Sequence, residues 1–174
     1  MYLKLYRNAP QGSAITGRLV INGRWFSNTL ERVGYQIPAL CYPVKVTMSP
    51  KFKRLLPLVC GVPRTDAKRR EARGENQKSK VNETSAAVSP DFKHSTLDIK
   101  QSALRSGIRF HRGTKPEHST GCILVPDRAS ENELTQLLLK AQNNHEEIIL
   151  EVTDYSPGTE YGYNTPCPRE LQER

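Results

Sequence analysis

The sequence has no apolar run that approaches the roughly 20 residues of a membrane-spanning helix. Hydrophobic residues make up 36% of the 174 residues, and the mean hydropathy is −0.62. We therefore do not expect an integral membrane protein. The first residues, Met1 to Asn8, also have no apolar core of the length that a secretory signal needs, so we expect synthesis in the cytoplasm without a signal peptide.

Paired cysteine motifs are missing too. The sequence has four cysteines, and no two of them form a C-x-x-C pair; they are Cys41, Cys60, Cys122 and Cys167. This argues against a structural zinc site and against a thioredoxin-like motif, and we expect neither a metal nor a cofactor. A chain of this length can bury a core without disulfides, so a reducing compartment of synthesis is the default expectation.

Aromatic residues are missing from the most basic part of the chain. Residues 51–80 carry ten Lys and Arg against three acidic residues, which is +7 of the net charge of +8. From 64 to 89 the only large apolar residues are Val81 and Val88, so this stretch cannot bury enough surface to offset the entropy of ordering it. We predict a hydrophilic insertion over 64–93. A nucleic-acid-binding arm is the alternative, but such arms often carry aromatic residues for base stacking, and we do not expect nucleic acid as a partner.

Alternating hydrophobic patterns predict a mostly β domain. Asn22-Gly23 lies between two such segments and predicts a hairpin with a type I′ turn, because that turn needs positive φ at both central positions. Pro43 is expected at an edge or a bulge, since it cannot donate to a ladder. The segments expected to be extended are 2–6, 16–21, 24–30, 40–48, 107–111, 121–125 and 148–152.

One helix is expected, and it follows the last of the short central segments. Ser130 is its predicted N-cap, with Glu133 reaching back as in a capping box, and the pair Asn143-Asn144 suits its end. The apolar residues of this helix recur at helical spacing. We predict a small β-sandwich or barrel-like domain with one helix over 1–153, interrupted by the insertion, and an irregular tail over 154–174.

Chemically, the segment from 106 to 125 is the most informative. His111 ends a predicted strand, a loop with glycine follows, and Cys122 enters the next apolar stretch. A thiol is only a few per cent ionised at neutral pH, and a nearby imidazole can accept its proton. Gly121 allows a substrate to approach the backbone closely, and the amides around Gly121 and Cys122 can stabilise an oxyanion. We expect Cys122 to have the lowest pKa of the four cysteines.

Each of these residues also has a structural interpretation. Cys122 alone is most often a small buried hydrophobe, and His111 alone a histidine bonded to backbone. Metal binding by His111, His118 and Cys122 is another alternative, but no fourth ligand lies nearby in the sequence. The presence of two glycines and a serine between His111 and Cys122 favours a site.

The same residues resemble the catalytic domain of the L,D-transpeptidases, the YkuD-like superfamily. The resemblance rests on His111-x-Gly113-Thr114 and on Ser119-x-Gly121-Cys122-Ile123, preceded by Ile37-Pro38-Ala39 before a strand and followed by a helix and a strand. It is strongest to a small, uncharacterised family from phages and bacterial mobile elements, and it covers about 1–63 and 106–153. Thr120, Leu124 and Leu40 depart from the family pattern, and the eleven-residue interval from His111 to Cys122 is short.

The resemblance implies a cysteine acyl-transfer enzyme that acts on peptidoglycan stem peptides. Cys122 would be the nucleophile that forms a thioester, His111 the base, and water or an amine the acceptor. The loop would be shaped by Ser119, Gly121, Gly113 and Thr114, with secondary roles for Arg109, His118 and Thr120. Such an enzyme would act at the cell wall or in the periplasm, or as part of a virion. The alternative is a non-catalytic phage or mobile-element protein that keeps the fold for wall binding or as a virion component.

Overall fold

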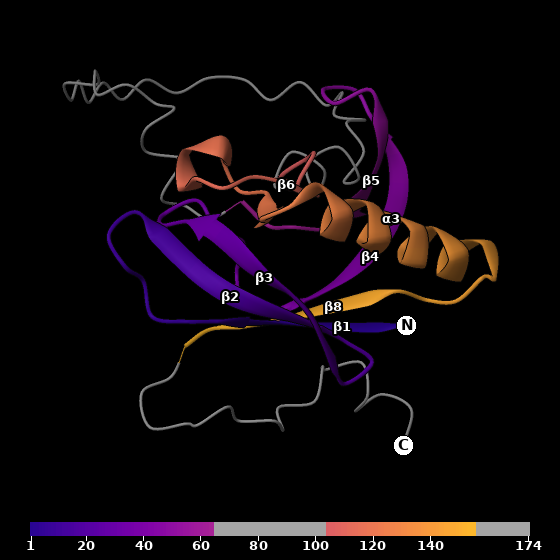
Figure 1. Ribbon diagram of the computed structural model, residues 1–174, viewed down its shortest axis with the longest axis horizontal. Helices are drawn as coiled ribbons and strands as arrows, with labels where there is room; N and C mark the ends of the chain where they lie inside the picture. The colour runs from indigo at the N-terminus through magenta and orange to yellow at the C-terminus, as the bar shows by residue number, and fades with distance from the viewer. Residues whose placement is uncertain (65–103, 156–174) are drawn as a thin grey trace, which may run out of the picture.

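The protein is mainly β: an eight-stranded mixed sheet that is nearly closed into a barrel, with one α-helix (Figure 1). The computed structural model describes residues 1–64 and 104–155. The elements are β1 (Tyr2–Arg7), β2 (Ala14–Ile21), β3 (Arg24–Arg32), β4 (Cys41–Ser49), β5 (Arg54–Val59), β6 (Phe110–Arg112), a 3-10 helix η1 (Pro116–His118), β7 (Ile123–Val125), α3 (Arg128–Asn143) and β8 (Ile149–Thr153).

The strand order explains how the sheet curls around. It runs β5-β4-β8-β1-β2-β3-β7-β6, with parallel pairing only between β1 and β8 and between β6 and β7. The two ends of this order then meet. Leu58 of β5 forms an antiparallel bridge with Arg109, and the amide of Val59 donates to the carbonyl of Ile108 at 2.8 Å. The short central strands therefore lie between β3 and the β4–β5 hairpin.

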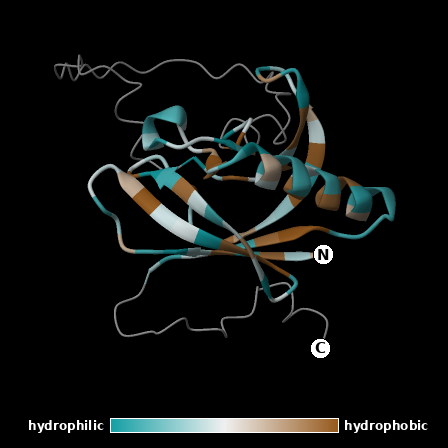
Figure 2. Cartoon of the chain, viewed as in Figure 1, coloured by the Kyte–Doolittle hydropathy of each residue, from teal (hydrophilic) through white to brown (hydrophobic). Residues whose placement is uncertain are grey.

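The expected hairpin at Asn22-Gly23 is confirmed. Asn22 has φ of 47° and Gly23 has φ of 80°, the left-handed pair that a type I′ turn needs. Along the paired strands, alternate residues are buried, and hydrophobic and hydrophilic positions alternate in Figure 2. The inward residues include Leu3, Leu5 and Leu19, which are fully buried in one core cluster.

The helix α3 packs against β4, β5, β6 and β7, and Leu134 and Leu138 enter the same core. Near its end, the side chain of Gln142 pairs with the backbone of Val46 in β4. Its Oε1 accepts from the Val46 amide at 2.7 Å, and its Nε2 donates to the Val46 carbonyl at 3.3 Å. Because β8 pairs with β4 only over 41–43, the side chain of Gln142 supplies the hydrogen bonds that a neighbouring strand would otherwise make with Val46.

Several predicted details differ from the structure. The helix begins one turn earlier than expected, because Asp127 is the N-cap and its carboxylate accepts from the amide and hydroxyl of Ser130. Pro43 lies in an interior strand, at the point where the ladder with β5 ends, so its missing amide breaks no pair there. Of the two predicted architectures, the structure shows the barrel-like one, since all eight strands lie in one hydrogen-bonded order that nearly closes.

The predicted insertion over 64–93 lies, apart from Arg64, outside the described residues, as does the predicted tail apart from Asp154 and Tyr155. Among the described residues, none of the helices has the length and apolar character needed to cross a bilayer.

Candidate functional site

Cys122 lies immediately before β7, against the segment that leads into β6. It is a free thiol, as is Cys60, whereas Cys41 is disulfide-bonded. The Cys122 Sγ donates to the carbonyl of Gly107 at 3.7 Å. Burial raises the pKa of the Cys122 thiol, and the amide of Arg109 and the cations of Lys51, Arg105 and Arg109 offset part of this rise. The expectation that Cys122 has the lowest pKa of the four cysteines gains no support from this balance, because desolvation is its largest part.

His111 lies in the middle of β6 and is buried, with 4% of its surface exposed. Its Nδ1 is 2.9 Å from the carbonyl of Arg112. A carbonyl can only accept, so Nδ1 carries the proton and Nε2 is left as the basic nitrogen. Burial lowers the pKa of His111, so the imidazole is neutral at pH 7. This combination suits a general base more than a permanent imidazolium.

The ladder between β6 and β7 fixes the relation of the two residues. His111 lies opposite Leu124, so Cys122 stands two residues before the partner of His111. With strands about 4.8 Å apart and a rise of about 3.3 Å per residue, the two Cα atoms are about 8 Å apart. Among the hydrogen bonds of the described residues, the thiol bonds Gly107 and the imidazole bonds Arg112, without a direct bond between them. The ladder thus places Cys122 and His111 near each other in the fold.

A tight turn holds the backbone before Cys122. The buried hydroxyl of Ser119 donates to the carbonyl of Cys122 at 2.7 Å and accepts from the amide of Gly121 at 2.9 Å. The Gly121 amide is therefore engaged, which corrects the expectation that it is an oxyanion donor. In the described part of the chain, no acceptor bonds the amide of Cys122. That amide is the donor left for a developing oxyanion.

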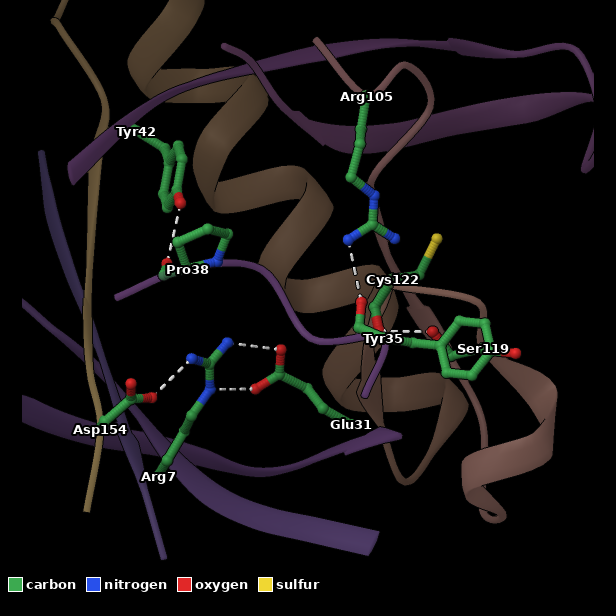
Figure 3. Close-up of polar contacts among 9 residues, drawn as sticks. All are labelled: Arg7, Glu31, Tyr35, Pro38, Tyr42, Arg105, Ser119, Cys122 and Asp154. Carbon is green, nitrogen blue, oxygen red and sulfur yellow. Dashed lines mark hydrogen bonds and ion pairs between the residues drawn. The ribbon is translucent and has the colours of Figure 1, made fainter. Parts of the chain in front are cut away.

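Arg105 spans this turn, as Figure 3 shows beside Cys122. Its Nη1 donates to the carbonyl of Tyr35 at 2.9 Å, and its Nη2 donates to the carbonyl of Thr120 at 2.7 Å. The guanidinium joins the segment after β3 to the turn before the cysteine, and its charge lowers the pKa of the Cys122 thiol. Sequence analysis missed Arg105, because its partners are backbone carbonyls that carry no side-chain signal.

The other predicted residues have structural roles or lie at the surface. Arg109 is buried and donates to the backbone carbonyls of Thr47, Met48 and Leu56, so it braces the β4–β5 hairpin. Gly113 is covered by the side chain of Leu124, which leaves no room for a β-carbon. The exposed residues of the group are Thr114, His118 and Thr120.

His118 lies on η1, and its Nδ1 is 3.4 Å from the amide of Thr114. Among residues 1–64 and 104–155, no three His, Cys, Asp or Glu side chains are grouped so that they could hold a metal ion. The alternative of a metal site at His111, His118 and Cys122 therefore has no support in the described residues.

Two buried ion pairs flank this region, and sequence analysis found neither. Glu31 binds Arg7 through two bonds of 2.7 and 2.8 Å, and Asp154 binds the same guanidinium at 2.7 Å (Figure 3). Glu131, at the start of α3, holds Arg54 through two bonds of 2.6 Å and accepts from the amide of Arg112 beside His111. Single charged residues give no sign in the sequence of the distant residue with which they will pair.

Tyr42 lies in the core beside the first of these pairs. Its hydroxyl donates to the carbonyl of Pro38 at 2.8 Å, and burial, the largest cause, raises its pKa to about 12. The hydroxyl therefore stays protonated at neutral pH and acts as a donor that fixes the segment before β4.

Comparisons with protein-family models, with curated proteins and with solved structures gave no significant match to this chain.

Proposed function

We propose that the protein is a cysteine acyl-transfer enzyme of the L,D-transpeptidase type that acts on peptidoglycan stem peptides, and that its barrel is a variant of the YkuD-like catalytic domain. The observation that carries the proposal is the free Cys122 thiol next to the strand that holds a buried, neutral His111. The motif resemblance around both residues supports the same reaction class. Hydrolysis by a carboxypeptidase or endopeptidase and transfer to an amine share this chemistry.

The first half of the reaction forms a thioester. The Cys122 sulfur attacks the carbonyl carbon at an L-D peptide bond, and its proton passes to Nε2 of His111. The negative charge that develops on the carbonyl oxygen is stabilised by the amide of Cys122. As the C–N bond breaks, the leaving amine takes the proton from His111. The Cys122 thiol and the His111 imidazole are both neutral before the reaction, so the attack does not begin from a thiolate–imidazolium pair.

The second half releases the acyl group. Water or an acceptor amine attacks the thioester carbonyl and gives its proton to His111. The C–S bond then breaks, and the sulfur takes the proton back as the thiol returns. The turn formed by Ser119 and Gly121, with Arg105 across it, would keep the Cys122 amide aimed at the same oxygen in both halves. No cofactor takes part, and the proposed place of action is the cell wall, the periplasm or the virion.

The test is incubation of the full chain with purified peptidoglycan and with soluble tetrapeptide muropeptides, followed by chromatography and mass spectrometry of the products. We expect release of a D-amino acid or a cross-linked product, and a covalent acyl adduct on the intact protein. Cys122→Ala should abolish both, whereas the matched control Cys60→Ala should retain both. Digestion by Cys122→Ala at the wild-type rate would contradict the assignment of the nucleophile.

A second candidate is a non-catalytic wall-binding or virion protein that keeps the fold. It is favoured by the raised pKa of the Cys122 thiol and by its hydrogen bond to Gly107 instead of His111. Sedimentation with insoluble peptidoglycan distinguishes the two. Binding that is the same in wild type and Cys122→Ala, without any product, would favour this candidate.

A further inference from the structure

The turn between β4 and β5 lies against the imidazole of His111. The rings of Phe52 and His111 have centroids 4.7 Å apart and are tilted by 39°. The Lys51 ammonium lies 5.4 Å from the centroid of the same Phe52 ring. These two distances place the ammonium within about 10 Å of the imidazole centroid. The hairpin tip thus brings a cation to the candidate site from a part of the chain about 60 residues earlier.

Among the residues that the structure describes, four cations act on Cys122 or His111, and three of them are held by acceptors of the protein. Arg54 binds the carboxylate of Glu131, Arg105 binds two backbone carbonyls, and Arg109 is bonded to the backbone of β4 and β5. Lys51 is different. Its side chain is exposed, and within 1–64 and 104–155 no residue accepts a hydrogen bond from it or pairs with its charge.

The Lys51 charge is also directed at the reacting groups. It lowers the pKa of both the Cys122 thiol and the His111 imidazole. A cation that acts on both groups and has neither an acceptor nor an anion among the described residues is available to an anion that enters the site. Its flexible stem and three donors allow it to meet a carboxylate without a fixed geometry.

We propose that Lys51 binds a carboxylate of the substrate and makes the Cys122 site selective for anionic acyl donors. The selectivity for acyl donors rests on the proposed function. The preference of the Cys122 thiol for anionic reagents does not depend on it. Its physical basis is the attraction between unit charges at the site, which at about 4–7 Å in a water-like medium changes a rate by about three- to sixfold.

The experiment measures the alkylation of Cys122 by iodoacetate and by iodoacetamide, which differ in charge and little in size. In both, the thiolate displaces iodide as the S–C bond forms. The ratio of the two rate constants at one pH cancels the thiolate fraction, so a change in the pKa of the thiol does not affect it. We expect Lys51→Gln to lower the iodoacetate-to-iodoacetamide ratio at Cys122 by about three- to sixfold relative to wild type.

The matched control is Lys53→Gln, which removes the same charge from the same turn and should leave the ratio within about 1.5-fold. In 1 M NaCl the wild-type ratio should approach that of Lys51→Gln, because the screening length falls to about 3 Å. An unchanged ratio in a folded Lys51→Gln protein would overturn the proposal, as would equal effects of both substitutions. A lack of reaction at Cys122 with either reagent would overturn it too, since no substrate could reach the thiol.

The two proposals fail separately. A lowered ratio without any action on peptidoglycan would leave the anion preference in place and contradict the proposed enzyme. Release of product from muropeptides with the same kcat/KM in wild type and Lys51→Gln would keep the enzyme and contradict the role of Lys51.

Discussion

The guanidinium of Arg105 occupies the space in which a β-carbon at position 121 would lie. An added β-carbon would also come within 3.0 Å of the carbonyl of Tyr35, and Gly121 has φ of 124°. Glycine is therefore required there for two reasons: the backbone conformation and the closeness of Arg105. The same contact holds the turn that presents Cys122.

Gly121→Ala should lower the free energy of unfolding by about 2–4 kcal/mol, because strain at this φ adds to the displacement of Arg105. Urea denaturation measures the change. The matched control is Gly12→Ala, at φ of 59° with open space around the β-carbon, which carries only the conformational cost of about 1 kcal/mol. Equal losses in the two variants would show that Arg105 is not displaced.

The rate at which iodoacetamide alkylates Cys122 should increase with pH up to the raised pKa of this thiol. The thiolate is the reactive form, and burial raises the pKa of this thiol, so the rate should reach half its maximum above about pH 8.5. Peptide mapping of the modified protein measures this rate at each pH. N-acetylcysteine serves as the reference thiol, and Cys122→Ala identifies the peptide that carries Cys122. A rate that levels off near neutral pH would mean that the cations around the thiol outweigh its burial.

His111 should make the protein less stable in mild acid. Burial lowers the pKa of His111 in the folded protein, so the unfolded chain binds the proton at higher pH. The free energy of unfolding should fall as the pH decreases from 7 through about 6.5, and go on falling until the folded-state pKa is passed. His111→Gln should show a smaller loss between pH 7 and 5, measured by urea denaturation. If the enzyme proposal holds, the acidic limb of kcat/KM should lie below pH 6.5 for the same reason.

Gln142 should contribute to stability through β4. Gln142→Ala removes partners from the amide and carbonyl of Val46, and the free energy of unfolding should fall by about 1–3 kcal/mol. Gln136→Ala, at an exposed position of the same helix, is the control and should change it by less than about 0.5 kcal/mol. Equal effects would mean that water replaces the lost side chain at Val46.

Local patterns predicted most of the secondary structure. Period-two alternation predicts strands because alternate residues face a core, and Asn22-Gly23 predicts its hairpin because few residues accept positive φ. The helix was predicted, but its first turn was placed too late. Asp127 and Ser130 are both favourable N-cap residues, and sequence spacing alone does not show which of them is the last extended residue before the helix.

The candidate site was predicted in part. His111 and Cys122 were proposed from their residue types and the glycines near them, and the ladder between β6 and β7 places His111 in one strand and Cys122 just before the neighbouring one. The raised pKa of Cys122 was not predicted, because desolvation depends on how much protein surrounds the sulfur. Lys51, Arg105 and Glu131 were missed, since each acts across a long sequence separation.

The sequence by itself determined most strands, the hairpin, the helix and the choice of His111 and Cys122 as candidates, because each depends on residue type and on neighbours a few positions away. Only the tertiary structure decided that the sheet curls until β5 meets the segment before β6, which places the β4–β5 turn beside His111. Within 1–64 and 104–155 it also decided which cations near the candidate site are held by acceptors and that Lys51 is not. Burial and charge pairing depend on contacts between segments distant in the chain, and no local pattern encodes them.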